Sequence, residues 1–145
     1  MKPTTIALGA ALLTATAALA HEGVKNAAVK ARMDGMSAIA ANMKTLGQMA
    51  KGEKEFDTVQ ARSAAATIAQ HAAAAPGLFE PEETDPKTEA LPAIWTNFAD
   101  FTAKAADLEA IATGLSTSIN DAADLGPAMR ALGGSCKACH ERYRE

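Results

Sequence analysis

The chain has 145 residues, a formal net charge of −3, 48% hydrophobic residues and only 4% aromatic residues. This length suits a single domain of ordinary size. The acidic balance argues against nucleic acid as a partner, because phosphate backbones are bound by an excess of Lys and Arg. With so few large side chains, a core would pack weakly unless it enclosed a bulky apolar group.

Residues 1–20 have the pattern of a secretory signal peptide. Lys2 supplies the positive start, an apolar run extends from Ile6 to Ala17, and Ala18-Leu19-Ala20 forms a small-residue cleavage site. The apolar run is too short to span a bilayer, and charges interrupt every later apolar stretch, so we expect no membrane span. The sequence therefore predicts an exported domain over residues 21–145.

Apolar residues recur in steps of three and four along most of this domain, which predicts amphipathic helices over residues 26–50, 57–75, 92–115 and 126–143. Asp57 and Gln60 have the spacing of a capping box, and Pro76-Gly77 predicts the end of the second helix. Pro92 suits the first position of the third helix. Since no stretch alternates with period two, we expect an all-α, antiparallel four-helix bundle.

Residues 76–91 form the longest predicted irregular segment. A loop of this length in a compact domain is usually functional or mobile. It carries a group of acidic residues that we expect to keep the surface soluble, with a basic partner protein as the alternative: Glu80, Glu82, Glu83 and Asp85.

The predicted last helix carries Cys136-Lys137-Ala138-Cys139-His140. C-x-x-C-H is the attachment motif of a c-type haem. Two thiols three residues apart can each form a thioether with one porphyrin, and the next residue offers an imidazole to the iron. Because positions i, i+3 and i+4 share one face of a helix, the three side chains can project together.

A cysteine pair at this spacing has two other common uses. A thioredoxin-like redox dithiol normally opens a helix within a βαβ pattern, which this chain does not show. A structural zinc site requires four ligands, and two cysteines with three scattered histidines supply too few. We therefore expect covalent haem, and no structural disulfide between Cys136 and Cys139.

The chain resembles the cytochrome c′ family, including its low-spin cytochrome c-556 members, over nearly all of residues 21–145. The resemblance rests on three segments: Ala28-Val29-Lys30-Ala31-Arg32, Pro92-Ala93-Ile94-Trp95, and the run from Cys136 to Arg144. It implies a four-helix bundle enclosing one haem c.

The resemblance also assigns roles to individual residues. It implies that His140 is the proximal iron ligand, that Arg32 lies near a haem propionate, and that Arg144 lies beside the proximal haem face. Glu89 corresponds to an acidic residue near the haem.

Met36, four residues after Arg32, corresponds to the family position that faces the distal side of the haem. In the c-556 type a methionine at this position binds iron, and a thioether ligand favours ferrous iron and suits reversible one-electron transfer. Met33, Met36 and Met43 also lie on one helical stripe, which is the ordinary pattern of core packing. Both interpretations of Met36 stay open at this point.

The sequence thus predicts a periplasmic, mono-haem electron carrier that exchanges electrons with redox partner proteins and is not an enzyme. The alternative is a five-coordinate cytochrome c′ that binds nitric oxide or carbon monoxide at a vacant distal site. A haem-free helical redox or interaction module is the third hypothesis. The resemblance also allows for a homodimer formed through the first two helices.

Overall fold

The computed structural model describes residues 23–145, so the predicted signal peptide at residues 1–20 lies outside the described residues. Within residues 23–145 the chain forms helices and no strand, apart from one isolated antiparallel bridge between Ala90 and Arg144. The prediction of an all-α fold is confirmed. The elements in chain order are α1 (Ala27–Ala50), α2 (Thr58–Phe79), α3 (Ala93–Thr96), α4 (Phe98–Ser118), the 3₁₀ helix η2 (Ala122–Asp124) and α5 (Leu125–Tyr143).

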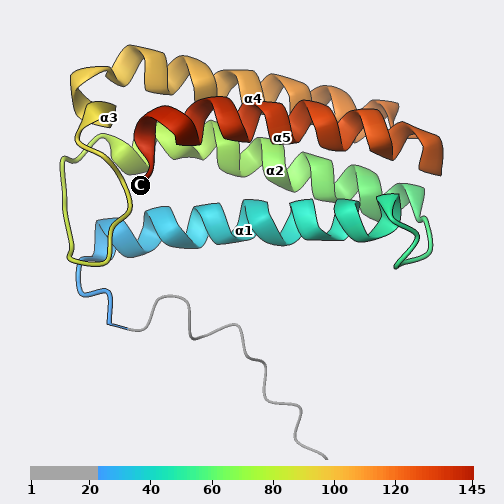
Figure 1. Ribbon diagram of the computed structural model, residues 1–145, viewed down its shortest axis with the longest axis horizontal. Helices are drawn as coiled ribbons and strands as arrows, with labels where there is room; N and C mark the ends of the chain where they lie inside the picture. Colours follow the sequence, from blue (N-terminus) through green and yellow to red (C-terminus); the bar gives the residue numbers. More distant parts are fainter. Residues whose placement is uncertain (1–22) are drawn as a thin grey trace, which may run out of the picture.

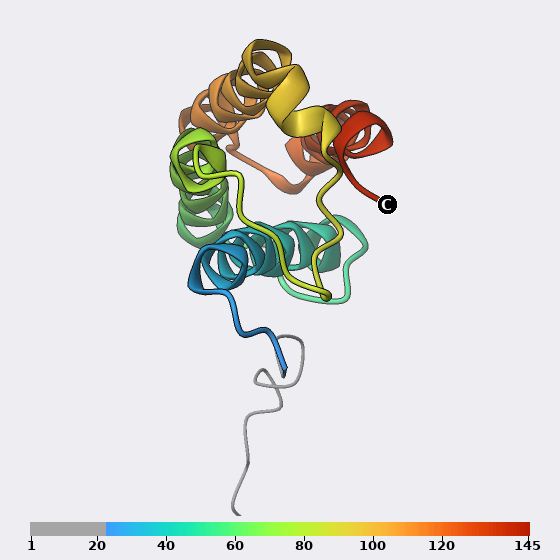
Figure 2. The ribbon, with the colours of Figure 1, turned by 90° about the vertical axis from the view of Figure 1, so that its left-hand side faces the viewer.

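The four long helices form an antiparallel bundle (Figure 1). α1 packs against α2, α2 against α4, α4 against α5, and α5 against α1. Seen end-on, the four helices therefore occupy the corners of a ring, and the segment between α2 and α3 crosses one end of it (Figure 2). The predicted four-helix bundle is confirmed.

Side-chain caps fix the starts of the first two helices. The Asn26 side chain accepts hydrogen bonds from the amides of Ala28 and Val29 at 2.9 and 3.1 Å. The Asp57 carboxylate accepts one from the Gln60 amide at 2.9 Å, as the Asp57/Gln60 spacing predicts. Such caps satisfy amides that have no partner within the helix.

Two predicted helix boundaries are wrong. α2 continues through Pro76 to Phe79, although proline removes one helical hydrogen bond. Burial of Ala75 and Phe79 stabilises this last turn, and Arg32 donates a hydrogen bond to the carbonyl of Leu78 within it. The predicted third helix is divided, because Asn97 adopts φ −129° and ψ 40° between α3 and α4.

The buried apolar residues form two separate clusters. The larger one includes Leu46, Met49 and Ile68, and Met43 packs against it. At Gly47 an added Cβ would lie 3.5 Å from Met129 Cε, so α1 and α5 approach each other closely in this half of the bundle. The smaller cluster lies in the other half and comprises Phe79, Ile94, Phe101 and Tyr143.

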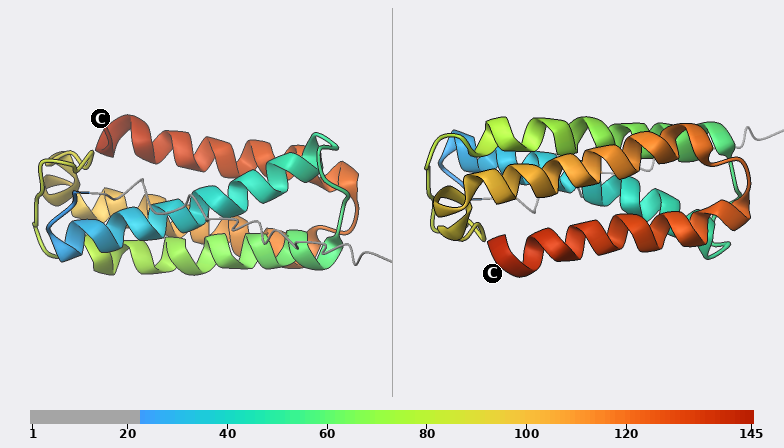
Figure 3. Two further views of the ribbon diagram at one scale, coloured as in Figure 1. Left: turned by 90° about the horizontal axis from the view of Figure 1, so that it is seen from below. Right: turned by 90° about the horizontal axis from the view of Figure 1, so that it is seen from above.

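α1 and α5 separate toward the end of the bundle that holds the C-terminus (Figure 3). The C-x-x-C-H motif and Met36 both lie in this half, on α5 and α1 respectively. The helix arrangement thus brings the predicted site residues to the splayed end of the bundle. None of the helices formed by residues 23–145 has the length and apolar character needed to cross a membrane.

Candidate haem site

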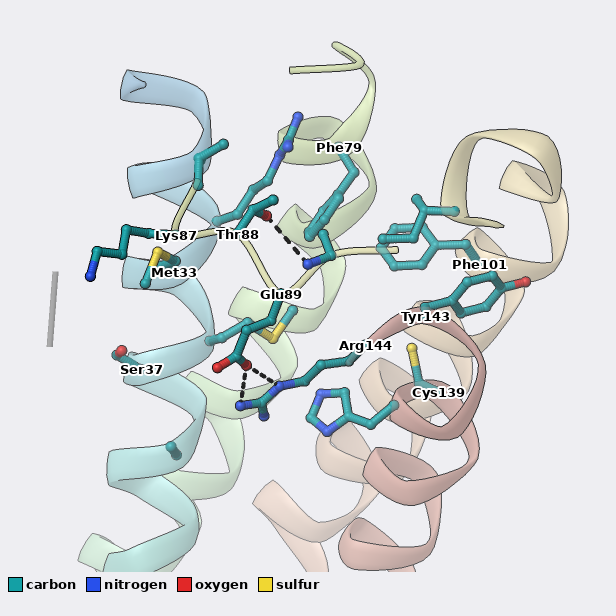
Figure 4. Close-up of a pocket in the computed structure, with 17 residues that line it drawn as sticks. Met33, Ser37, Phe79, Lys87, Thr88, Glu89, Phe101, Cys139, Tyr143 and Arg144 are labelled. Atoms are coloured by element: carbon teal, nitrogen blue, oxygen red, sulfur yellow. Dashed lines mark hydrogen bonds and ion pairs between the residues drawn. The ribbon is translucent and has the colours of Figure 1, made fainter. Parts of the chain in front are cut away.

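A cavity of about 340 Å³ lies between α1, α5 and the segment that joins α2 to α3. Figure 4 shows Met33 and Ser37 on the α1 side, Cys139 and Tyr143 on the α5 side, and Glu89 between them. Phe79 and Phe101 close the inner wall, so much of the lining is apolar. The volume and the mixture of apolar walls with a few polar groups are typical of a small-molecule or cofactor site.

The sequence-predicted site residues largely meet at this cavity. Six of the seven line it: Arg32, Met36, Glu89, Cys139, His140 and Arg144. Cys136 does not line it, but it lies one turn before Cys139 and His140 on the same face of α5. The structure therefore brings residues from three separate parts of the chain to one place.

Cys136 and Cys139 are free thiols, and both are partly buried. Burial raises the pKa of each thiol above its ordinary value of 9.0. A catalytic redox dithiol requires the opposite, since the thiolate is the nucleophile and reactive cysteines have lowered pKa values. Cys136 and Cys139 also lie far from the start of α5, where a redox dithiol would normally be found, so the redox-dithiol interpretation is disfavoured.

His140 lines the cavity from the last turn of α5. Partial burial lowers the pKa of its imidazole, the charge of Arg144 lowers it further, and Glu89 opposes the shift. The neutral imidazole is thereby favoured at neutral pH, and this is the form that binds metals.

The three methionines of the α1 stripe have different surroundings. Met43 packs against the larger core cluster, whereas Met33 and Met36 line the cavity. Met36 is 37% exposed, which is unusual for a large apolar side chain in this protein. Packing alone therefore accounts for Met43, but it leaves the place of Met36 unexplained.

Arg32 is 3% exposed and is held by backbone carbonyls. Its Nε donates to Leu78 O at 2.9 Å, Nη1 donates to Glu83 O at 2.8 Å, and Nη2 donates to Pro81 O. The guanidinium carbon also lies 4.7 Å from the centre of the Phe79 ring. Burial lowers the pKa of Arg32, while the charge of Glu83 raises it.

Through these contacts Arg32 binds the last turn of α2 and the segment that follows it. The three bonds to described residues use three of the five N–H donors of the guanidinium. The Trp95 ring lies on the same guanidinium at 5.4 Å, and its indole N–H donates to Phe79 O at 2.8 Å. The contacts of Arg32 with three carbonyls and two rings are not predicted by the sequence.

Glu89 and Arg144 form an ion pair across the cavity mouth, as the dashed lines in Figure 4 show. Backbone hydrogen bonds reinforce it: Leu91 N donates to Tyr143 O, and Glu145 N donates to Glu89 O, both at 3.0 Å. Both side chains of the pair are about half exposed. The pair is therefore too exposed to stabilise the fold strongly. Its two charges instead act on the nearby His140.

The expectation that Asp85 serves solubility is wrong. Asp85 is 7% exposed, and its carboxylate accepts hydrogen bonds from the amides of Lys25, Asn26 and Lys87 at 2.9 to 3.1 Å. It attaches the loop to the start of α1. Glu80, Glu82 and Glu83 are exposed, as expected. Only tertiary structure distinguishes the four acids, since their local sequences are equally polar.

The residues at the cavity fit a haem c. Cys139 and His140 line one side of an apolar-walled space and Met36 the other. A thiol can bond to the porphyrin, while an imidazole and a thioether are donors that haem iron accepts. Among residues 23–145, no group of three or more His, Cys, Asp or Glu side chains is arranged to hold a metal ion directly. The described part of the chain therefore offers no protein-only zinc site.

The model of the family described as "Cytochrome C'" matches residues 27–144. The chain belongs to the cytochrome c′ family. It is 40% identical to a cytochrome c-556 of Agrobacterium fabrum, over 80% of each chain. The solved structure of cytochrome c′ from Rhodopseudomonas palustris is 32% identical and superimposes with a TM-score of 0.77, covering 83% of this chain and 98% of that one. A structural model of oxidised R. palustris cytochrome c556 is 31% identical with a TM-score of 0.76, covering 82% and 96%.

Members of the family are haem proteins rather than enzymes, and they bind haem c. The presence of Cys136 and Cys139 in a C-x-x-C-H motif agrees with this membership. The third hypothesis, a haem-free helical module, therefore does not agree with the family to which the chain belongs.

Proposed function

We propose that this protein is a periplasmic electron carrier with one haem c per chain, attached by thioethers to Cys136 and Cys139. His140 is the proximal ligand and Met36 the distal one. One observation carries the proposal: Cys139, His140 and Met36 line the same apolar-walled cavity from two different helices. The relatives named cytochrome c-556 are consistent with it.

A bound haem supplies reversible one-electron chemistry at its iron. The residues of this chain hold and tune it. The α5 helix presents two thiols and one imidazole on a single face, and the raised pKa of each thiol keeps it protonated and unreactive toward other targets before attachment. Met36 contributes a soft thioether sulfur, which favours the reduced metal.

Three charged residues complete the proposed haem environment. Glu89 and Arg144 lie close enough to His140 for their charges to act on its imidazole. Arg32 holds the loop that carries Glu89, and the N–H donors that these bonds do not use are the ones available to a haem carboxylate. The main role of Arg32 at the proposed haem site is thus to hold the loop that forms one wall of the cavity.

The proposed location is the periplasm, with residues 1–20 as the export signal and residues 21–145 as the haem domain. The partners are redox proteins of that compartment. The acidic net charge of −3 speaks against nucleic acid. A homodimer stays a prediction.

A second candidate is a five-coordinate haem protein that binds nitric oxide or carbon monoxide. The observation that favours it is that Met33 lines the same cavity from α1, so a methionine can lie at this wall without being an iron ligand. Relatives named cytochrome c′ are as similar in fold as the c556 relative. The two candidates have the same attachment cysteines and the same proximal ligand, and they differ only in whether Met36 binds the iron.

Absorption and magnetic spectra of the purified holoprotein separate the two candidates. The carrier predicts a low-spin ferric spectrum with a methionine–iron charge-transfer band that Met36→Ala abolishes. Met33→Ala is the matched control, since Met33 lines the same cavity from the same helix and should leave the band intact. A high-spin ferric spectrum with ready carbon monoxide binding in the wild type would replace the carrier by the gas-binding protein.

A further inference from the structure

Two adjacent glycines, Gly133 and Gly134, lie in the interior of α5. Each costs about 1 kcal/mol of helix stability relative to alanine. Neither has a positive φ, so the backbone does not require glycine. A Cβ added at either position would meet nothing within 4 Å, so packing against the described residues does not require glycine either.

The two glycines lie on different faces of α5. Gly133 precedes Cys136 by three residues and His140 by seven, which places it on their stripe of the helix. Gly134 is about 100° further round the helix and is exposed, whereas Gly133 is only partly exposed. Only Gly133 therefore shares a face with the haem-binding motif.

Side chains on a helix lean toward its N-terminus and cover the preceding turn. A group bonded to the Cys136 sulfur consequently lies over the turn that contains residues 132 and 133. Leu132 is completely buried in the larger core cluster, so Gly133 is the residue of this pair that faces the open side of the turn. A methyl group there would occupy space that no described residue fills and that a group attached to Cys136 would cover.

We propose that Gly133 is a positioning residue for the haem, and that its missing side chain leaves room for the porphyrin attached to Cys136. This inference rests on the proposed function. It explains why a residue that weakens α5 is present where neither the backbone nor protein packing requires it.

The test compares alanine and leucine substitutions at Gly133 with Gly134→Ala and Gly114→Ala in the holoprotein. Gly114 lies inside α4, and a Cβ there would also meet nothing within 4 Å. Covalent haem per chain and the ferric absorption spectrum are the primary readouts, and circular dichroism reports helical content. Both controls should raise the melting temperature by roughly 2–4 °C with haem content and spectrum unchanged.

Gly133→Ala is expected to shift the spectrum or reduce the haem content while helical content is kept, and Gly133→Leu to do so more strongly. Wild-type haem content and spectrum in both Gly133 variants would overturn the inference. The same change in Gly134→Ala would also overturn it, because the effect would then not depend on the face. Wild-type protein without covalent haem would instead refute the proposed function, so the two failures are distinguishable.

Discussion

The amide of Leu91 donates a hydrogen bond of 3.0 Å to the carbonyl oxygen of Tyr143. This bond joins the loop before α3 to the last residue of α5, and the antiparallel bridge between Ala90 and Arg144 extends it. The loop is also attached to α1 through Arg32 and Asp85. It therefore connects the two helices that carry the proposed axial ligands, at the end of the bundle where those helices separate.

The ion pair between Glu89 and Arg144 should contribute little to the stability of this connection. Both side chains are about half exposed, and exposed pairs contribute about 0–1 kcal/mol. We expect Glu89→Gln to lower the free energy of unfolding by less than about 1 kcal/mol, and the difference to vanish in 1 M salt.

Chemical denaturation at low and high salt measures this effect. Lys30→Gln, which breaks the exposed Lys30–Asp34 pair, is the matched control and should behave in the same way. A loss of several kcal/mol in Glu89→Gln that persists in high salt would show that the carboxylate is structural.

Arg32 should be far more important for stability than an exposed arginine. Arg32→Lys replaces a planar group that donates to three carbonyls by one ammonium, and a hydrogen bond to a charged group contributes about 1.5–3 kcal/mol. We expect the free energy of unfolding to fall by at least about 2 kcal/mol.

Arg62→Lys is the control for Arg32→Lys. Arg62 donates to Ile119 O at 2.7 Å and to Asn120 Oδ1 at 2.6 Å, but it is only partly buried, so water can replace lost contacts. Denaturant titration should show the smaller loss for Arg62→Lys. Equal losses of unfolding free energy in the two variants would show that the burial of Arg32 does not increase its contribution to stability.

Asp85 should make stability depend on pH in the acid range. Hydrogen bonds from the amides of Lys87, Lys25 and Asn26 hold the pKa of its carboxyl below the ordinary value of 3.8. A carboxyl with a lowered pKa in the folded state stabilises the fold above its unfolded pKa. That stabilisation is lost as the pH falls from about 3.8 through the lowered folded value.

Melting temperatures between pH 2 and pH 7 test this prediction. Asp85→Asn should melt below the wild type at pH 7, and the gap should narrow as the pH falls below 3.8. Glu82→Gln, an exposed acid in the same loop, should follow the wild-type curve. A constant gap between Asp85→Asn and the wild type across the range would contradict the assignment.

The sequence predicted the fold because periodic apolar positions and local caps are properties of short segments. It predicted Cys139 and His140 as site residues because they belong to one short motif, and Met36 because of a family resemblance. It could not predict that Asp85 is buried or that Arg32 binds three carbonyls, since both depend on a loop whose course is fixed by distant partners. It also misplaced the end of α2, because burial of Phe79 outweighs the local effect of Pro76.

The most direct test of the account is the amount of haem that stays covalently bound to the purified protein. The wild type, exported in a host that matures c-type cytochromes, should retain one haem per chain after extraction with acid–acetone. Replacement of both Cys136 and Cys139 by alanine should leave none covalently bound. A colourless wild-type protein from the same host, or haem that is extracted completely, would contradict the account.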